Sequence, residues 1–180
     1  MEMLGVIPTS LHVTLGSTTL TAAQCTGLEP GGVIVLDDVW ARPISTPTPS
    51  TEGGFSGSFR LRLPKGAPRW TASLHSDGTL HVEDVVDEGE DTMVDQVDES
   101  LPANPGELLD EIPTELSVEV GRVALTAREA TMLSPGQTLR LKRRPGDLVE
   151  VRVGPKLVAR GELVHIEGEL GVLLREVFSR

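Results

Sequence analysis

The chain has 180 residues, of which 38% are hydrophobic and 3% are aromatic, with no tyrosine, and it carries a formal net charge of −11. It has no apolar run of the roughly 18 residues that a transmembrane helix needs, and its first residues lack the basic and apolar regions of a signal peptide. We therefore expect neither segment. The single cysteine, Cys25, excludes an internal disulfide and fits a reducing compartment.

The first segment of the chain is repeated later in the sequence. Residues 7–36 read IPTSLHVTLGSTTLTAAQCTGLEPGGVIVL, and residues 112–141 read IPTELSVEVGRVALTAREATMLSPGQTLRL. The two segments agree at 14 of 30 positions without a gap. Chance agreement at this length would be about two positions. The chain therefore contains two related units in tandem.

The similarity continues beyond these segments with a different offset. Residues 59–63 and 74–80 correspond to residues 149–153 and 164–170. The offset falls from 105 to 90, so the first unit carries 15 additional residues. We place them at about residues 38–57, a stretch rich in Pro, Ser, Thr and Gly without an apolar period. This composition predicts a disordered inserted loop.

Each unit is predicted to be mostly β with one short helix. In the second unit, alternating apolar residues predict a strand at 116–120, which ends at Gly121, and a short strand at 123–125. Thr126 and Glu129 have the spacing of a capping box, which begins a helix. The elements expected from there on are a helix at 127–133 and strands at 138–142, 148–153, 156–166 and 170–177.

The first unit repeats these signals. Thr21 and Gln24 have the spacing of the same capping box, and Pro30 and Gly31 end the helix as their counterparts do in the second unit. Asp77-Gly78 is a strong signal for a tight hairpin turn.

The acidic residues are concentrated between the two units. Residues 83–111 hold 12 of the 27 acidic residues and no Lys or Arg. Such a like-charged run repels itself and predicts an extended linker. Alternatively, this acidic run could bind calcium or a basic partner, but it lacks the residue spacing of a calcium-binding EF-hand loop. The expected organisation is a first domain at 1–85, a linker at 86–111 and a second domain at 112–180.

The sequence offers few candidates for catalysis. His75, Asp77 and His81 flank a predicted hairpin turn, and a metal-dependent enzyme that uses them is one alternative. Turn geometry explains Asp77 equally well. The chain has no phosphate-binding G-x-x-x-x-G-K-[ST] motif. The second unit also carries a group of basic residues without interleaved aromatic residues, so we expect no nucleic-acid binding. These basic residues are Lys142, Arg143, Arg144, Arg152, Lys156 and Arg160.

The motifs of the second unit resemble a SpoA (surface presentation of antigens) domain. They are VEVGR, LSPGQTLRL and KLVARGELVHIEGELGV, in this order within residues 112–177. The first unit keeps IPTSLHVTLG, LTA and LEPG and then departs, so it resembles a divergent SpoA domain. The resemblance implies two mostly β SpoA domains, each with one short helix, that pair into an intertwined, barrel-like pseudo-dimer.

Tandem SpoA domains resemble the C-terminal part of the SctQ family (also called HrcQ or YscQ) and are related to flagellar FliN. The resemblance implies a non-enzymatic component, without cofactor or metal, of the cytoplasmic sorting platform of type III secretion; the flagellar C-ring is the alternative. The implied partners are a stator protein of the SctL or FliH type, through it the export ATPase, and other copies of the chain or its free second SpoA domain. Direct membrane insertion is not expected.

The candidate binding residues follow the Gly161-Glu162 pair. In FliN-like proteins, the matching stretch contributes to binding the stator protein, which carries over to Leu163, Val164 and His165; Ile166 completes the candidate patch. The resemblance assigns a weaker role to Pro145, in the neighbouring turn, and His165 departs from the usual apolar residue. Apolar residues in succession predict an exposed docking patch or, alternatively, a central strand that is buried on both faces.

Overall fold

The computed structural model describes residues 7–43, 55–64, 68–75, 77–86, 109–143 and 147–178. Strands dominate these residues, which confirms the expected mostly β class. The elements are β1 (Pro8–Thr21), α1 (Ala22–Thr26), β2 (Val33–Val35), β3 (Asp38–Val39), β4 (Ala41–Pro43), β5 (Phe55–Gly57), β6 (Phe59–Arg62), β7 (Pro68–Leu74), β8 (Thr79–Val85), β9 (Pro113–Thr126), α3 (Ala127–Thr131), β10 (Thr138–Arg140), β11 (Val149–Val153), β12 (Lys156–Ile166) and β13 (Glu169–Val177).

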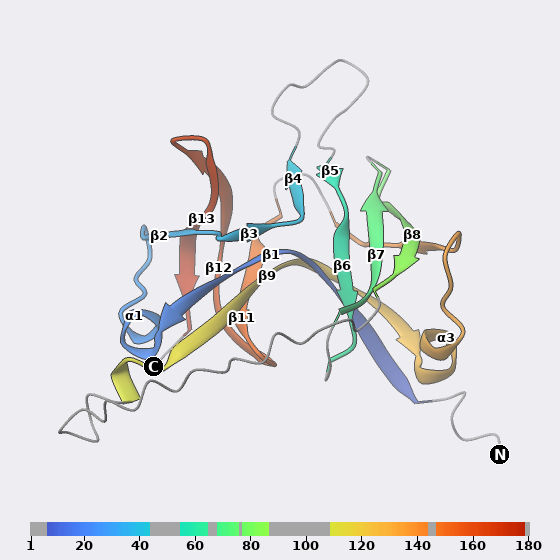
Figure 1. Cartoon of the computed structure of the whole chain (residues 1–180), viewed down its shortest axis with the longest axis horizontal. Coiled ribbons are helices and arrows are strands. Elements are labelled where there is room, and N and C mark those ends of the chain that lie inside the picture. The colour runs from blue at the N-terminus through green and yellow to red at the C-terminus, as the bar shows by residue number, and fades with distance from the viewer. Residues whose placement is uncertain are drawn as a thin grey trace.

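Strands β1 and β9, the first strands of the two repeats, form the centre of the molecule. They pair antiparallel along their length, from Pro8 opposite Thr126 to Thr21 opposite Pro113, and Figure 1 shows them side by side beneath the rest of the fold. The expected break at Gly121 is wrong, because β9 runs through it as one strand of 14 residues. The β1–β9 register shifts beside this glycine, where Val120 of β9 and Leu15 of β1 are each skipped between the Val13–Gly121 and Gly16–Val118 pairs.

The two repeats exchange strands at the ends of one sheet. Its order is β10-β8-β7-β6-β1-β9-β11-β12-β13-β2, and β3 also pairs with β1. Strand β2 of the first repeat therefore pairs with β13 of the second, and β10 of the second repeat pairs with β8 of the first. We call β6–β7–β8–β10 the first lobe and β11–β12–β13–β2 the second lobe; Figure 1 shows them rising on either side of β1 and β9. The strand path is open, so the expected barrel-like pseudo-dimer is not confirmed.

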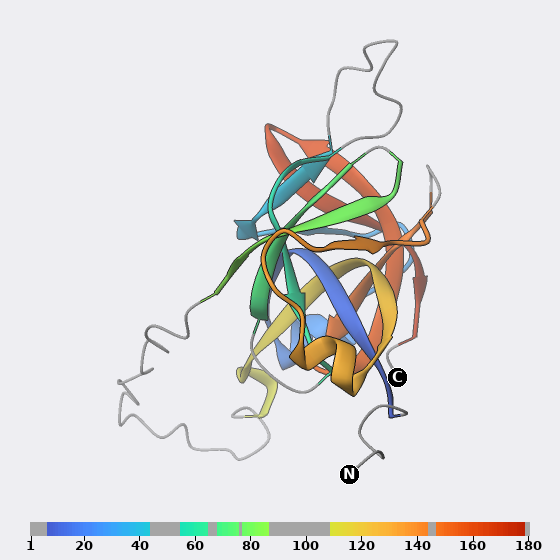
Figure 2. The same cartoon turned by 90° about the vertical axis from the view of Figure 1, so that its right-hand side faces the viewer.

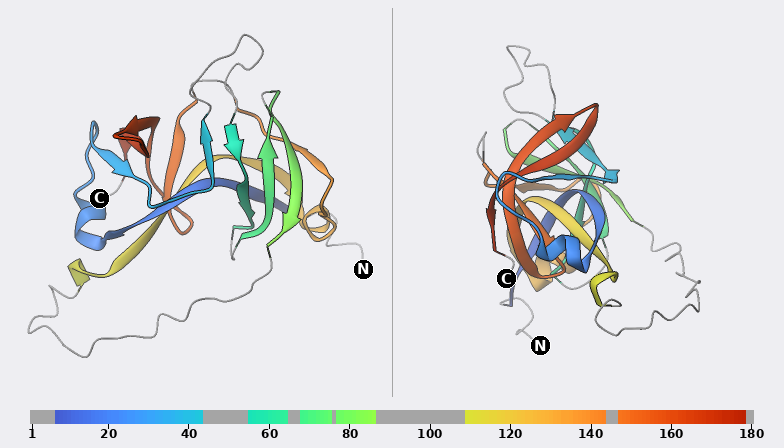
Figure 3. Two further views of the ribbon diagram at one scale, coloured as in Figure 1. Left: turned by 45° about the horizontal axis from the view of Figure 1, so that its top comes forward. Right: turned by 90° about the vertical axis from the view of Figure 1, so that its left-hand side faces the viewer.

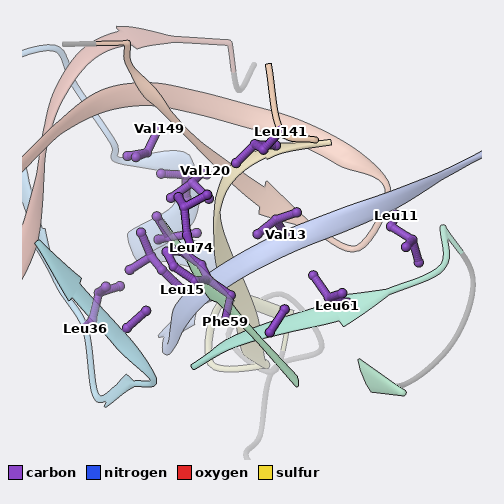
Figure 4. Close-up of a cluster of buried hydrophobic side chains, with 14 of the residues drawn as sticks. Leu11, Val13, Leu15, Leu36, Phe59, Leu61, Leu74, Val120, Leu141 and Val149 are labelled. Atoms are coloured by element: carbon purple, nitrogen blue, oxygen red, sulfur yellow. The ribbon is translucent and has the colours of Figure 1, made fainter. Parts of the chain in front are cut away.

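One hydrophobic core joins residues of both repeats. Residues 11–18 of β1 are all buried, and Leu11, Val13 and Leu15 have no exposed surface. They belong to the same buried cluster as Phe59 of β6 and Val120 of β9 (Figure 4). Because each repeat supplies side chains to this cluster, separating the repeats would expose apolar surface on both.

Both short helices begin as the sequence predicts. The side chains of Thr21 and Thr126 each accept a hydrogen bond from the backbone N–H three residues on. In return, the side chains of Gln24 and Glu129 each accept a hydrogen bond from the backbone N–H of the capping threonine. These reciprocal bonds satisfy N–H groups that a helix start leaves unpaired. The second helix is shorter than expected and ends at Thr131.

The insertion in the first repeat is partly structured. Within the predicted disordered loop at 38–57, β3 pairs with β1, and β4 and β5 form a two-stranded sheet (Figure 3). The prediction overlooked two aromatic residues that hold this segment in place. The ring of Phe55 packs edge-on against that of Phe59, and the guanidinium of Arg60 lies 4.0 Å from the ring centre of Trp40. Residues 44–54 lie outside the described residues.

Most of the predicted acidic linker, residues 87–108, also lies outside the described residues. Figure 2 shows the two repeats from the side on which β10 crosses toward β8. No helix of the described part of the chain has the length and apolarity to cross a membrane.

Candidate partner-binding surface

The predicted docking residues lie at the end of β12, next to the hairpin that leads into β13. Leu163 packs against the hydrophobic core and is half-buried. Val164 is half-buried, and His165 and Ile166 are exposed. The alternative of a strand buried on both faces is therefore wrong for this end of β12. The fifth candidate, Pro145, lies outside the described residues.

Strand pairing extends the apolar surface beyond β12. Val164 lies opposite Gly171 of β13, and Gly171 lies opposite Val35 of β2. Residues directly opposite each other on neighbouring strands point to the same face of a sheet. In the adjacent row, Leu173 of β13 lies opposite Val33 of β2. The core-facing residues alternate with these, which places all four apolar side chains on the outer face of the second lobe.

We call this surface the outer patch, and it consists of Val33, Val35, Val164, Ile166 and Leu173. Val33, Val35 and Ile166 are 41%, 37% and 38% exposed. Sequence reasoning missed the residues of β2 and β13, although alternation in VIV and in ELGVLL would have indicated outward-facing positions. It had no means of placing β2 beside β13, because these strands belong to different repeats.

Acidic side chains gather at the β12–β13 turn end of the outer patch. Glu167 and Glu169 are exposed at the β12–β13 turn. Glu162 accepts a hydrogen bond of 2.9 Å from Arg175, and this bond raises the pKa of the arginine. At the same end of the patch, Asp37 follows β2, and hydrogen bonds from the Thr18 hydroxyl and the Thr19 backbone hold its pKa below the usual value. The rim is therefore predominantly negative at neutral pH.

The Gly161-Glu162 pair has a geometric explanation. The β12–β13 register shifts between Arg160 and Gly161. A methyl group on Gly161 would lie 2.3 Å from the carbonyl oxygen of Leu173, well inside van der Waals contact. Only glycine permits this approach, so Gly161 sets the register that turns Val164 outward.

A second polar cluster lies buried between the repeats, and sequence reasoning missed it. Glu119 of β9 is 1% exposed, and its Oε1 lies 2.7 Å from Nδ1 of His12 of β1. Its Oε2 lies 3.1 Å from Nε of Arg152 of β11, and Arg62 of β6 lies 3.5 Å from Oε1. This cluster links four strands and can fix the pairing of the repeats, and it is covered rather than open to a ligand.

Glu150 extends the cluster toward the surface. Partial burial raises the pKa of its carboxyl, but hydrogen bonds from Arg152 and Arg160 and the charge of Arg122 outweigh this effect, so the pKa lies below the usual value. Glu150 thus remains charged and holds three arginines on one face of the sheet.

The histidine hairpin brings two of its three predicted metal ligands together. The ring centres of His75 and His81 are 4.4 Å apart. The Asp77 carboxylate accepts the Thr79 backbone N–H at 2.9 Å, which is the turn role, and this bond lowers its pKa. No group of three or more His, Cys, Asp or Glu residues in the described part of the chain has an arrangement that could hold a metal ion.

Two further residues, Arg143 and Cys25, are partly buried, and burial shifts the pKa of each. Arg143, one of the basic residues weighed for nucleic-acid binding, donates hydrogen bonds to the carbonyl oxygens of Val120 and Asp147, and burial lowers its pKa. Cys25 packs partly against the core, and burial raises the pKa of its thiol, which disfavours a thiolate nucleophile.

Residues 107–179, which contain the outer patch except for β2, match the family model described as "Type III flagellar switch regulator (C-ring) FliN C-term". The chain is also 34% identical over 89 residues to the flagellar motor switch protein FliN of Borreliella burgdorferi, covering 49% of this chain and 75% of that protein. The chain belongs to the FliN family.

Other members of the family are longer proteins. The flagellar motor switch phosphatase FliY of Bacillus subtilis is 33% identical over 79 residues, which cover 44% of this FliN-family chain and 21% of FliY. Yop proteins translocation protein Q of Yersinia pseudotuberculosis is 35% identical over 81 residues, which cover 44% of this chain and 26% of that protein. The chain thus spans about a quarter or less of these two relatives, one from a flagellar motor and one from a translocation system. These relatives agree with the SpoA resemblance and its link to both SctQ and FliN.

Proposed function

We propose that this chain is a non-enzymatic structural component of the cytoplasmic ring of a type III secretion system and that it binds the stator protein of the SctL or FliH type through Leu163, Val164, His165 and Ile166. The exposed Ile166 and the half-buried Val164 at the end of β12 carry the proposal, since an apolar surface open to solvent favours a protein partner. The stator protein would connect the ring to the export ATPase.

The tandem arrangement supports the secretion assignment. We propose that residues 1–85 and 112–180 are two SpoA domains joined by the acidic linker at 86–111 and paired within one chain as an intertwined pseudo-dimer. Strand exchange between β2 and β13 and between β8 and β10 supports this pairing. The proposed location is the cytoplasmic face of the secretion apparatus, and copies of the chain would associate with one another in the ring.

The flagellar C-ring is the second candidate, because several relatives are flagellar motor switch proteins. The two assignments differ in what deletion of the gene affects. Loss of substrate secretion with normal swimming supports the secretion platform, whereas loss of swimming supports the flagellar ring.

Binding of the stator protein is tested by a pull-down with the full chain and a Val164→Asp variant. The charge would lie in the apolar contact, so we expect the variant to fold but lose the stator protein. Ser73→Asp, on the outer face of the first lobe, is the matched control and should bind normally. Unchanged binding by Val164→Asp would refute this site.

A further inference from the structure

The outer faces of the two lobes correspond to each other through the repeat but differ in chemistry. In the first lobe, His81 of β8 lies opposite Ser73 of β7 and opposite Thr138 of β10. Thr79 lies opposite Arg140 of β10. These outward positions are all polar, whereas the second lobe carries the apolar outer patch.

The difference is clearest at the two exchanged edge strands. The offset of 105 makes Thr138 and Arg140 of β10 the counterparts of Val33 and Val35 of β2. An edge strand with polar or charged residues resists association, whereas one with exposed valines invites it. The same backbone geometry therefore presents an associating edge only in the second lobe.

The surrounding charges indicate the chemistry of the occupant. Glu167 and Glu169 lie at the β12–β13 turn, and β2 runs toward the same end of the outer patch, where it leads into the exposed Asp37 and Asp38. The base on the outer face of β13, Arg175, is paired with Glu162. A partner with an apolar stripe and basic residues at one end of that stripe would satisfy both features of this surface.

We propose that the outer patch is a composite site, completed by β2 of the first repeat, that docks one basic amphipathic segment of the stator protein per chain. This inference rests on the proposed function and adds to it two specificity-determining residues, Val33 and Val35, a partner charge and a stoichiometry. The polar outer face of the first lobe does not form a second site.

The experiment is calorimetric titration of the full chain with the purified stator protein. We expect one stator segment per chain. Val33→Thr combined with Val35→Thr keeps side-chain shape but removes apolar surface and should weaken the Kd about tenfold, as the loss of a contact anchor does. A second pair, Thr138→Asp with Arg140→Asp, tests the counterpart edge and should leave the Kd unchanged. Circular dichroism and thermal melting check that each variant is folded.

The charge of the partner is tested separately. Glu169→Lys should weaken binding several-fold, with Asp84→Lys on the first lobe as the control, and added salt should weaken binding of the wild-type chain by screening the same attraction. Two stator segments per chain, or wild-type affinity of the valine variant when Val164→Asp abolishes binding, would overturn the composite site and leave the proposed function standing. A wild-type chain that does not bind the stator protein would overturn the proposed function itself.

Discussion

Nδ1 of His12 lies 2.7 Å from Oε1 of Glu119, and the contact joins the first strands of the two repeats in the interior. The two residues are separated by 107 positions in the chain. Arg152 and Arg62 approach the same carboxylate from β11 and β6. The carboxylate is almost fully buried, and its ion pairs make the pairing of the repeats specific as well as apolar.

Loss of the buried charge should destabilise the whole chain. Glu119→Gln keeps the shape of the side chain but leaves Arg152 without its buried anion, so we expect the free energy of unfolding to fall by about 2–4 kcal/mol. Glu115→Gln, an exposed position on the same strand, should change it by less than about 0.5 kcal/mol. Urea unfolding measures both; equal effects would contradict a structural role for the cluster.

Acid should weaken the fold in a defined window. The folded-state pKa values of Glu150 and Asp37 lie below their usual values of 4.5 and 3.8. A lowered carboxyl pKa contributes stability that is complete above the unfolded-state pKa and is lost as the pH falls through the folded-state pKa. Stability should therefore decline below about pH 4.5. Glu150→Gln should reduce this decline in urea titrations, and an unchanged pH profile would disprove the contribution of Glu150.

Two glycines of β12 and its turn should respond differently to a methyl group. Gly161→Ala brings the new carbon to 2.3 Å from a backbone carbonyl oxygen of β13, so we expect a loss of at least about 2–3 kcal/mol. Gly168 has φ +90° and open space around it, so Gly168→Ala should cost only about 1 kcal/mol of backbone strain. Thermal melting compares them, and a smaller effect at Gly161 would contradict the close strand approach.

The repeats should stay together when the chain between them is cut. Insertion of a protease site between Asp95 and Gln96 allows specific cleavage of the full chain. Three strand pairings, β1 with β9, β2 with β13 and β8 with β10, each join a strand before the cut to a strand after it. We therefore expect the two fragments to co-elute in size-exclusion chromatography. Fragments that separate as two folded monomers would show that the repeats are independent.

The sequence read alone reveals much of this fold, because it contains a repeat. The alternation in residues 116–120 located β9, and the capping spacings located both helices because caps depend on local hydrogen bonds. The insertion was misjudged because Trp40 and Phe55 stabilise it through contacts with Arg60 and Phe59. Composition reports average polarity and not the few side chains that anchor a segment.

The sequence by itself determined the two repeats, the mostly β class and the capping boxes, since all of these depend on local periodicity or on direct similarity between the repeats. The tertiary structure alone decided that β2 lies beside β13 and that His12 meets Glu119. It also decided that Val33 and Val35 join Val164 on one face. Local signals say which residues form a strand, but the partner of a strand is chosen by burial and hydrogen bonding across the whole molecule.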